Sequence, residues 1–157
     1  MSENVTNVLG RTKQWFELAI PKPTKDNQRV QVGVHAEEVV EMLESLVDDN
    51  STDGLLINAK RSLHLLAERL KKDSTLTVST RDRKELLDAL CDQIVTATGV
   101  AHMYGFDIIG ALSEVNRSNF SKFVNDVPVF NEHGKISKGE FYTKPVLDPF
   151  VGSDPTI

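Results

Sequence analysis

The 157-residue sequence is poor in cysteine and has no zinc-ligand pattern. Its single cysteine, Cys91, can form neither an intramolecular disulfide nor a thiolate metal cluster, so we expect a reducing compartment, the cytoplasm. We interpret Cys91 as a small buried hydrophobic residue. The four histidines are scattered, without the spacing of a zinc site. The fold should therefore rest on a hydrophobic core.

Long hydrophobic runs and an excess of positive charge are also missing. The longest stretch without a charged residue, 93–106, is shorter than the about 20 residues that cross a bilayer, and no apolar stretch follows the N-terminus. We therefore expect neither a membrane span nor a secretory signal. The net charge of -5 argues against a nucleic-acid polymer as partner, because such binding depends on Lys and Arg. No P-loop, dinucleotide fingerprint or serine-nucleophile motif occurs.

The sequence does have the composition and periodicity of a helical domain. Hydrophobic residues make up 39% and charged residues 26%, which is ordinary for a folded protein. Apolar residues recur at helical spacing, and the expected helices cover residues 6–20, 30 or 34 to 48, 53–72, 80–104 and 107–123, with Asp53 and Asp107 as N-caps. We predict an all-α, four- to five-helix bundle in residues 1–124 with an irregular C-terminal extension, residues 125–157, in one domain overall.

The second expected helix carries a one-signed acidic stretch. Seven acids and no Lys or Arg lie between Arg29 and Lys60. Carboxylates at i and i+3 converge on a helix, so Glu38 and Glu41 could hold a hard divalent cation such as Mg²⁺. A solvated helix face is the other interpretation. The seven acids are Glu37, Glu38, Glu41, Glu44, Asp48, Asp49 and Asp53.

The fourth expected helix is apolar apart from two acids. Between residues 86 and 106 only Asp88 and Asp92 are charged, and they are spaced i and i+4. A helix that is apolar nearly all round is usually buried, and buried carboxylates are costly unless they are paired or bind metal. Two interpretations follow: a metal site shared with Glu38 and Glu41, or salt bridges to basic residues of the third helix. Those basic residues are Lys60, Arg61 and Arg69.

A polar, cationic segment follows the acids. Arg117 and Lys122 suit phosphate oxygens, neighbouring amides can bind further polar groups, and Lys138 extends the cationic character into the tail. An ordinary polar helix end is the alternative. An aromatic pair near the N-terminus is interpreted as packing, although it could stack on a base. The candidate ligand-binding residues are Asn116, Arg117, Asn119, Lys122, Lys138, Trp15 and Phe16.

In this order along the chain, the segments resemble the all-α nucleoside triphosphate pyrophosphohydrolase superfamily, which includes MazG-like proteins, dimeric dUTPases and phosphoribosyl-ATP pyrophosphohydrolases. The matching segments read EEVVE from Glu37, DALCDQIV from Asp88, EVNRSNFSK from Glu114 and GKISKG from Gly134. The last two resemble the phage and bacterial MazG-like branch. The common second motif is E-x-x-D, but Ala89 stands three residues before Asp92, and Asp88, or Glu85 with Asp88, would substitute.

The resemblance implies hydrolysis of a nucleoside triphosphate, expected to be a deoxynucleotide, between the α and β phosphates with Mg²⁺, or Mn²⁺ in its place. It implies Glu38, Glu41 and Asp92 as metal ligands, with Asp88 as the substitute fourth. Glu37 or Glu38 could take the proton of a metal-bound water. Arg117, Lys122 and Lys138 would hold the triphosphate.

The expected role is control of the nucleotide pool in a bacterial cell, or in the host cytoplasm if the protein is phage-encoded. Family members pair their bundles, so we expect a homodimer or homotetramer, with Trp15, Phe16 and the tail near the contact. Two alternatives stay open at this point. One is a phosphoribosyl-ATP pyrophosphohydrolase, and the other is a non-enzymatic module that binds a partner through its acidic face.

Overall fold

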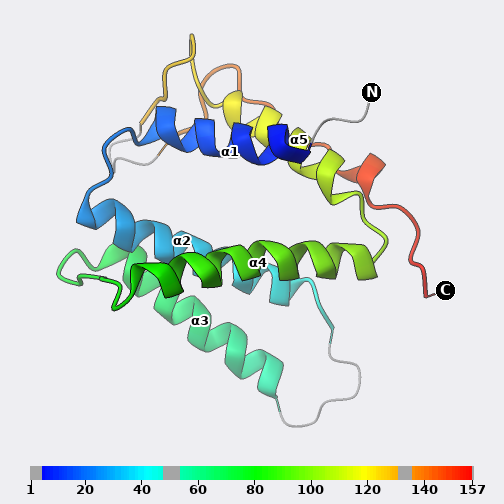
Figure 1. The fold of residues 1–157 in the computed structure, drawn as a ribbon, viewed down its shortest axis with the longest axis horizontal. Helices are drawn as coiled ribbons and strands as arrows, with labels where there is room; N and C mark the ends of the chain where they lie inside the picture. The colour runs from blue at the N-terminus through cyan, green and yellow to red at the C-terminus, as the bar shows by residue number, and fades with distance from the viewer. Residues whose placement is uncertain (1–4, 48–53, 131–135, 157) are drawn as a thin grey trace. The chain divides into compact units, whose positions relative to one another are not determined.

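The computed structural model describes residues 5–47, 54–130 and 136–156. Over these ranges it contains five α-helices, one short 3-10 helix and no strand (Figure 1). The prediction of an all-α fold is confirmed. Asp48, Asp49, Asp53, Gly134 and Lys135 lie outside the described residues. The helices are α1 (Val5–Ala19), α2 (Lys25–Glu44), α3 (Leu55–Lys72), α4 (Arg83–Met103) and α5 (Ile108–Phe120), and the 3-10 helix η1 is Asp148–Phe150.

The chain divides into two compact units. Unit 1 consists of Met1–Pro21 and Asp82–Ile157, and unit 2 of Lys22–Arg81. Unit 1 therefore contains α1, α4, α5 and the C-terminal tail with η1, whereas unit 2 is the hairpin of α2 and α3. A single bundle over residues 1–124 stays a prediction. No described helix has both the length and the apolar character needed to cross a membrane.

Unit 2 is built on a close approach of two helices. The start predicted for the second helix, residue 30 or 34, is wrong, because Thr24 and Asn27 form a capping box that starts α2 at Lys25. Further along α2, Gly33 is buried against Ala67 and Leu70 of α3. A Cβ atom at Gly33 would lie 2.9 Å from the Cβ atom of Leu70. The glycine therefore sets the distance between the two helices.

Replacing this glycine should loosen unit 2. We expect Gly33→Ala to lower the free energy of unfolding by about 1–3 kcal/mol, because the new methyl group overpacks the contact with α3. Gly10→Ala on α1 is the matched control, since nothing lies within 4 Å of its added Cβ, and alanine should raise stability by up to about 1 kcal/mol. Urea unfolding of both variants is the measurement. Equal effects of the two substitutions would contradict the close approach.

Unit 1 is organised around the contact between α1 and α5, which lie side by side (Figure 1). Asn116 of α5 is buried and joins the two helices: it accepts a hydrogen bond from the Thr12 hydroxyl at 2.9 Å and donates one to the Val8 carbonyl at 3.0 Å. The buried ring of Phe123 stacks on Trp15 with centroids 5.8 Å apart. The predicted end of the last helix at residue 123 is wrong, since α5 ends at Phe120.

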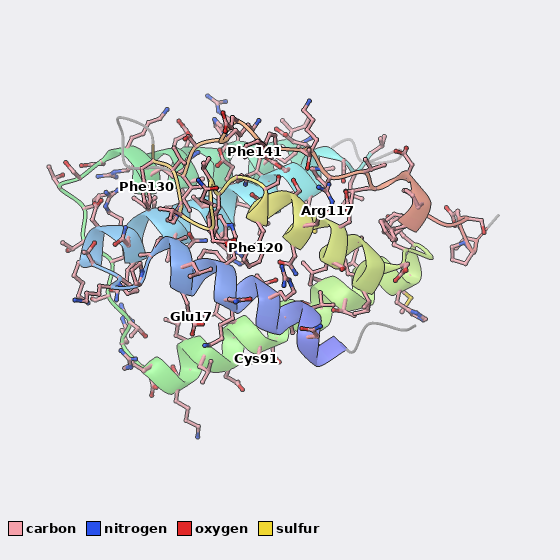
Figure 2. All side chains as sticks on the ribbon, turned by 90° about the horizontal axis from the view of Figure 1, so that it is seen from above. Glu17, Cys91, Arg117, Phe120, Phe130 and Phe141 are labelled. Atoms are coloured by element: carbon pink, nitrogen blue, oxygen red, sulfur yellow. The ribbon has the colours of Figure 1, made fainter. Side chains whose placement is uncertain are left out.

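The fourth helix differs most from its expected environment. Asp82 caps α4 and Gly105, with a φ of 73°, follows its end, which confirms a helix that stops at this glycine. The helix was predicted to be buried, but its large apolar side chains are exposed; Leu87 is 63% and Ile94 50% exposed. Cys91, expected to be buried, is exposed as well (Figure 2). The hydrophobic periodicity of the sequence predicts the helix, but it does not predict whether other residues bury its apolar side chains.

Candidate functional site

The acids of α2 lie in unit 2 and have different surroundings. Glu37 is partly buried and forms an ion pair with Lys71 of α3, which also pairs with Glu68 at 2.7 Å. Burial alone would lower the pKa of Lys71, but hydrogen bonds to the two carboxylates outweigh it and raise that pKa. Glu38 and Glu41, one turn apart, are exposed. Glu37 thus has a structural partner in Lys71, and the carboxylates of Glu38 and Glu41 lie at the surface of α2.

The acids of α4 lie in unit 1 and are also exposed. Asp88 and Asp92 occupy one face of the helix, opposite Leu87, Leu90 and Ile94. The expectation of buried carboxylates on this helix is therefore wrong. Within unit 1 neither carboxylate forms an ion pair with a described Lys or Arg. Arg69, one of the cations considered as a partner, pairs with Asp73 at the end of its own helix.

The predicted metal ligands thus fall into two pairs on different units. Each pair offers only carboxylate oxygens, which is the donor chemistry that Mg²⁺ prefers. Over the described residues no group of three or more His, Cys, Asp or Glu side chains could by itself hold a metal ion. The two pairs are Glu38 with Glu41 in unit 2 and Asp88 with Asp92 in unit 1.

Four of the predicted ligand-binding residues lie together in unit 1. The Trp15 indole of α1 donates a hydrogen bond to the Asn119 carbonyl at 2.9 Å, and the Lys122 ammonium lies 5.8 Å from the centre of the Trp15 ring. Lys122 also donates to the Asn119 side-chain oxygen at 2.8 Å. Phe16 packs edge-on against Trp15. We call Trp15, Asn119 and Lys122 the tryptophan–lysine cluster.

The other predicted ligand-binding residues have structural partners. Asn116 is buried between α1 and α5, as described above. Arg117 faces the tail: it forms two hydrogen bonds with the Glu114 carboxylate, at 2.7 and 2.6 Å, and donates to the Lys144 carbonyl at 3.0 Å (Figure 2). Lys138 lies over the Tyr142 ring, 4.9 Å from its centre. Sequence reasoning missed Glu114, although its i, i+3 spacing from Arg117 was a signal for an ion pair.

The ionisation of Glu114 should report this contact. The Arg117 guanidinium, and next the Val146 backbone N–H, lower the pKa of Glu114 from 4.5 to about 2. Because the folded-state pKa is lowered, the stabilisation by this pair is fully present above pH 4.5 and is lost as the pH falls towards 2. Carbon-13 NMR of the carboxyl group should give a midpoint near 2. In Arg117→Gln the midpoint should move up towards 4.5, and a wild-type midpoint already near 4.5 would contradict the contact.

An open pocket lies beside the Glu114–Arg117 pair, within unit 1. Its volume is about 540 Å³, inside the usual range for small-molecule sites. Phe120 and Phe150 form part of its wall, and the Arg11 guanidinium lies 4.5 Å from the centre of the Phe120 ring. The pocket therefore combines aromatic surface with a cation of α1, which the sequence alone did not single out.

Comparison of the chain with protein-family models, with curated proteins and with solved structures finds no match.

Proposed function

We propose that this chain is a metal-dependent nucleoside triphosphate pyrophosphohydrolase of the MazG-like type, which releases a nucleoside monophosphate and pyrophosphate. The observation that carries the proposal is the tryptophan–lysine cluster. An aromatic ring of α1, an amide of α5 and the ammonium group of Lys122, which follows α5, meet in unit 1, as a ligand with both a base and phosphates requires. The ordered acidic and cationic motifs of the sequence support the same activity.

The proposal assigns different roles to the two kinds of charged residue. Glu38, Glu41, Asp88 and Asp92 would hold Mg²⁺, which supplies charge neutralisation and an activated water when bound. Lys122 and Lys138 would bind the phosphates and stabilise charge on the leaving pyrophosphate. Glu38, or Glu37, which pairs with Lys71, would accept a proton from water. The open pocket, with its aromatic wall, is large enough for part of a nucleotide.

A substrate screen tests this function. The full chain is incubated with ribo- and deoxynucleoside triphosphates and with phosphoribosyl-ATP, with and without Mg²⁺, and orthophosphate is measured before and after addition of inorganic pyrophosphatase. We expect a signal that requires both Mg²⁺ and the pyrophosphatase. Orthophosphate without the pyrophosphatase would contradict cleavage between the α and β phosphates. No turnover of any nucleotide would favour the non-enzymatic acidic module.

We also propose that the protein is a homodimer or homotetramer. The apolar side chains of α4 are exposed on the described chain, and exposed apolar patches of this kind are typical of interaction surfaces. We expect Leu87→Glu, on this face, to reduce the molar mass measured by light scattering to that of one chain. The control is Lys84→Glu, an exposed residue nearer the start of α4. A wild-type protein that is monomeric and fully active would contradict this proposal.

A further inference from the structure

The C-terminal tail runs antiparallel along α5 from one end of the helix to the other (Figure 1). The Thr143 amide donates to the Ser121 hydroxyl at 2.9 Å, and the Val146 amide donates to the Glu114 carboxylate at 2.9 Å. At the start of α5, the Asp107 amide donates to the Phe150 carbonyl at 2.9 Å. Hydrogen bonds spaced along the whole length of α5 therefore hold the tail against this helix.

Arg117 uses most of its N–H donors in hydrogen bonds to Glu114 and to the tail. Its Nε and Nη2 atoms donate to the two Glu114 oxygens, Nη2 donates also to the Lys144 carbonyl, and Nη1 donates to the Thr143 hydroxyl. A guanidinium has five N–H groups, so these four bonds leave one. Bidentate binding of a phosphate takes two parallel N–H groups. In this arrangement Arg117 is committed to Glu114 and the tail.

The docked tail places the backbone next to a second lysine, Lys138, against the backbone of Lys122. A Cβ atom at Gly139 would lie 2.8 Å from the Lys122 carbonyl oxygen, so the backbone next to Lys138 passes directly against Lys122. Over the described residues neither lysine forms an ion pair with a carboxylate. Two unneutralised cations on adjacent backbone suit a ligand with several phosphates.

We propose that Glu114 and Arg117 are a positioning pair for the proposed reaction: by docking the tail on α5, they hold Lys138 beside Lys122, where both cations bind the triphosphate. This inference rests on the proposed function. It replaces the expectation that Arg117 itself contacts the phosphates, because its donors are engaged with Glu114, Thr143 and Lys144. Arg117 thus acts through Lys138.

A double-mutant cycle distinguishes the positioning role from direct contact. If Arg117 acts through Lys138, Arg117→Gln and Lys138→Ala should each lower kcat/KM roughly tenfold or more, and the double variant should be less than about twofold worse than Lys138→Ala alone. Residues that bind the phosphates independently would instead multiply their effects. Multiplied effects, or wild-type kinetics in Arg117→Gln, would overturn the proposal.

Hydrogen exchange supplies a readout without substrate. The Thr143 and Val146 amides, which bond to α5 in the docked tail, should exchange faster in Arg117→Gln and Glu114→Gln than in wild type. Lys13→Ala, which removes an exposed lysine of α1 paired with Glu17, is the control and should leave both amides protected. Unchanged protection in Arg117→Gln would overturn the proposal even if turnover falls. Absence of wild-type turnover would instead overturn the proposed function, and the exchange would still test the docking.

Discussion

We expect kcat to fall roughly a thousandfold or more in each of three variants, Glu38→Gln, Glu41→Gln and Asp92→Asn. Each variant should keep the fold of the wild type. These carboxylates would hold the proposed metal, which would supply charge neutralisation and an activated water, and an amide is a weaker ligand than a carboxylate for a hard cation. In the absence of metal, removing one of several like charges relieves repulsion. The melting temperature of each apo variant should therefore stay the same or rise.

The measurement combines kcat with thermal unfolding of the apo protein. Glu44→Gln is the matched control, since Glu44 is an exposed acid at the end of the same helix and is not a proposed ligand. It should keep wild-type kcat. Variants of Glu38, Glu41 or Asp92 that unfold at lower temperature would show that these acids form structural salt bridges. Wild-type kcat in all three variants would contradict the proposed metal site.

The second large effect should come from the lysine of the tryptophan–lysine cluster. We expect Lys122→Ala to lower kcat/KM roughly ten- to a hundredfold, because loss of a charge-assisted contact costs about 1.5–3 kcal/mol. A lower kcat would mean that the contact strengthens in the transition state, near the leaving pyrophosphate. The affinity of the apo protein for Mg²⁺ should not change, since the ammonium acts on substrate oxygens.

Steady-state kinetics and metal titration of Lys122→Ala test this prediction. Lys13→Ala again serves as the control, because Lys13 is on α1 close to Trp15 but is exposed and paired with Glu17. Its kcat/KM should equal that of the wild type. Wild-type kinetics in Lys122→Ala would contradict a phosphate-binding role. The polar, cationic segment that contains Lys122 would then be interpreted as an ordinary polar helix end.

The helices were predictable from the sequence because local signals define them. Asp107 accepts a hydrogen bond from the Gly110 amide as an N-cap, and Gly105 takes the positive φ that follows α4. The start of α2 was placed too late because the apolar pattern begins at Val30, whereas the helix begins after the capping box of Thr24. The capping signal at Thr24, six residues before Val30, outweighed the hydrophobic periodicity.

The candidate site was only partly predictable, because partners that are distant in sequence decide the role of a charged residue. Asn119 and Lys122 were identified by their chemistry and do lie against Trp15. Arg117 has the same chemistry, but its donors are taken by Glu114 and by tail residues more than 25 positions away. Glu37 is likewise held by Lys71 of α3. Spacing along one helix gives no information on such partners.

Phosphorus-31 NMR of a nucleoside triphosphate incubated with the wild-type protein and Mg²⁺ tests the central claim most directly. The account predicts that the three triphosphate resonances are replaced by those of a nucleoside monophosphate and of pyrophosphate, in equal molar amounts, and that Glu41→Gln leaves the triphosphate intact. Appearance of a nucleoside diphosphate and orthophosphate would contradict the account.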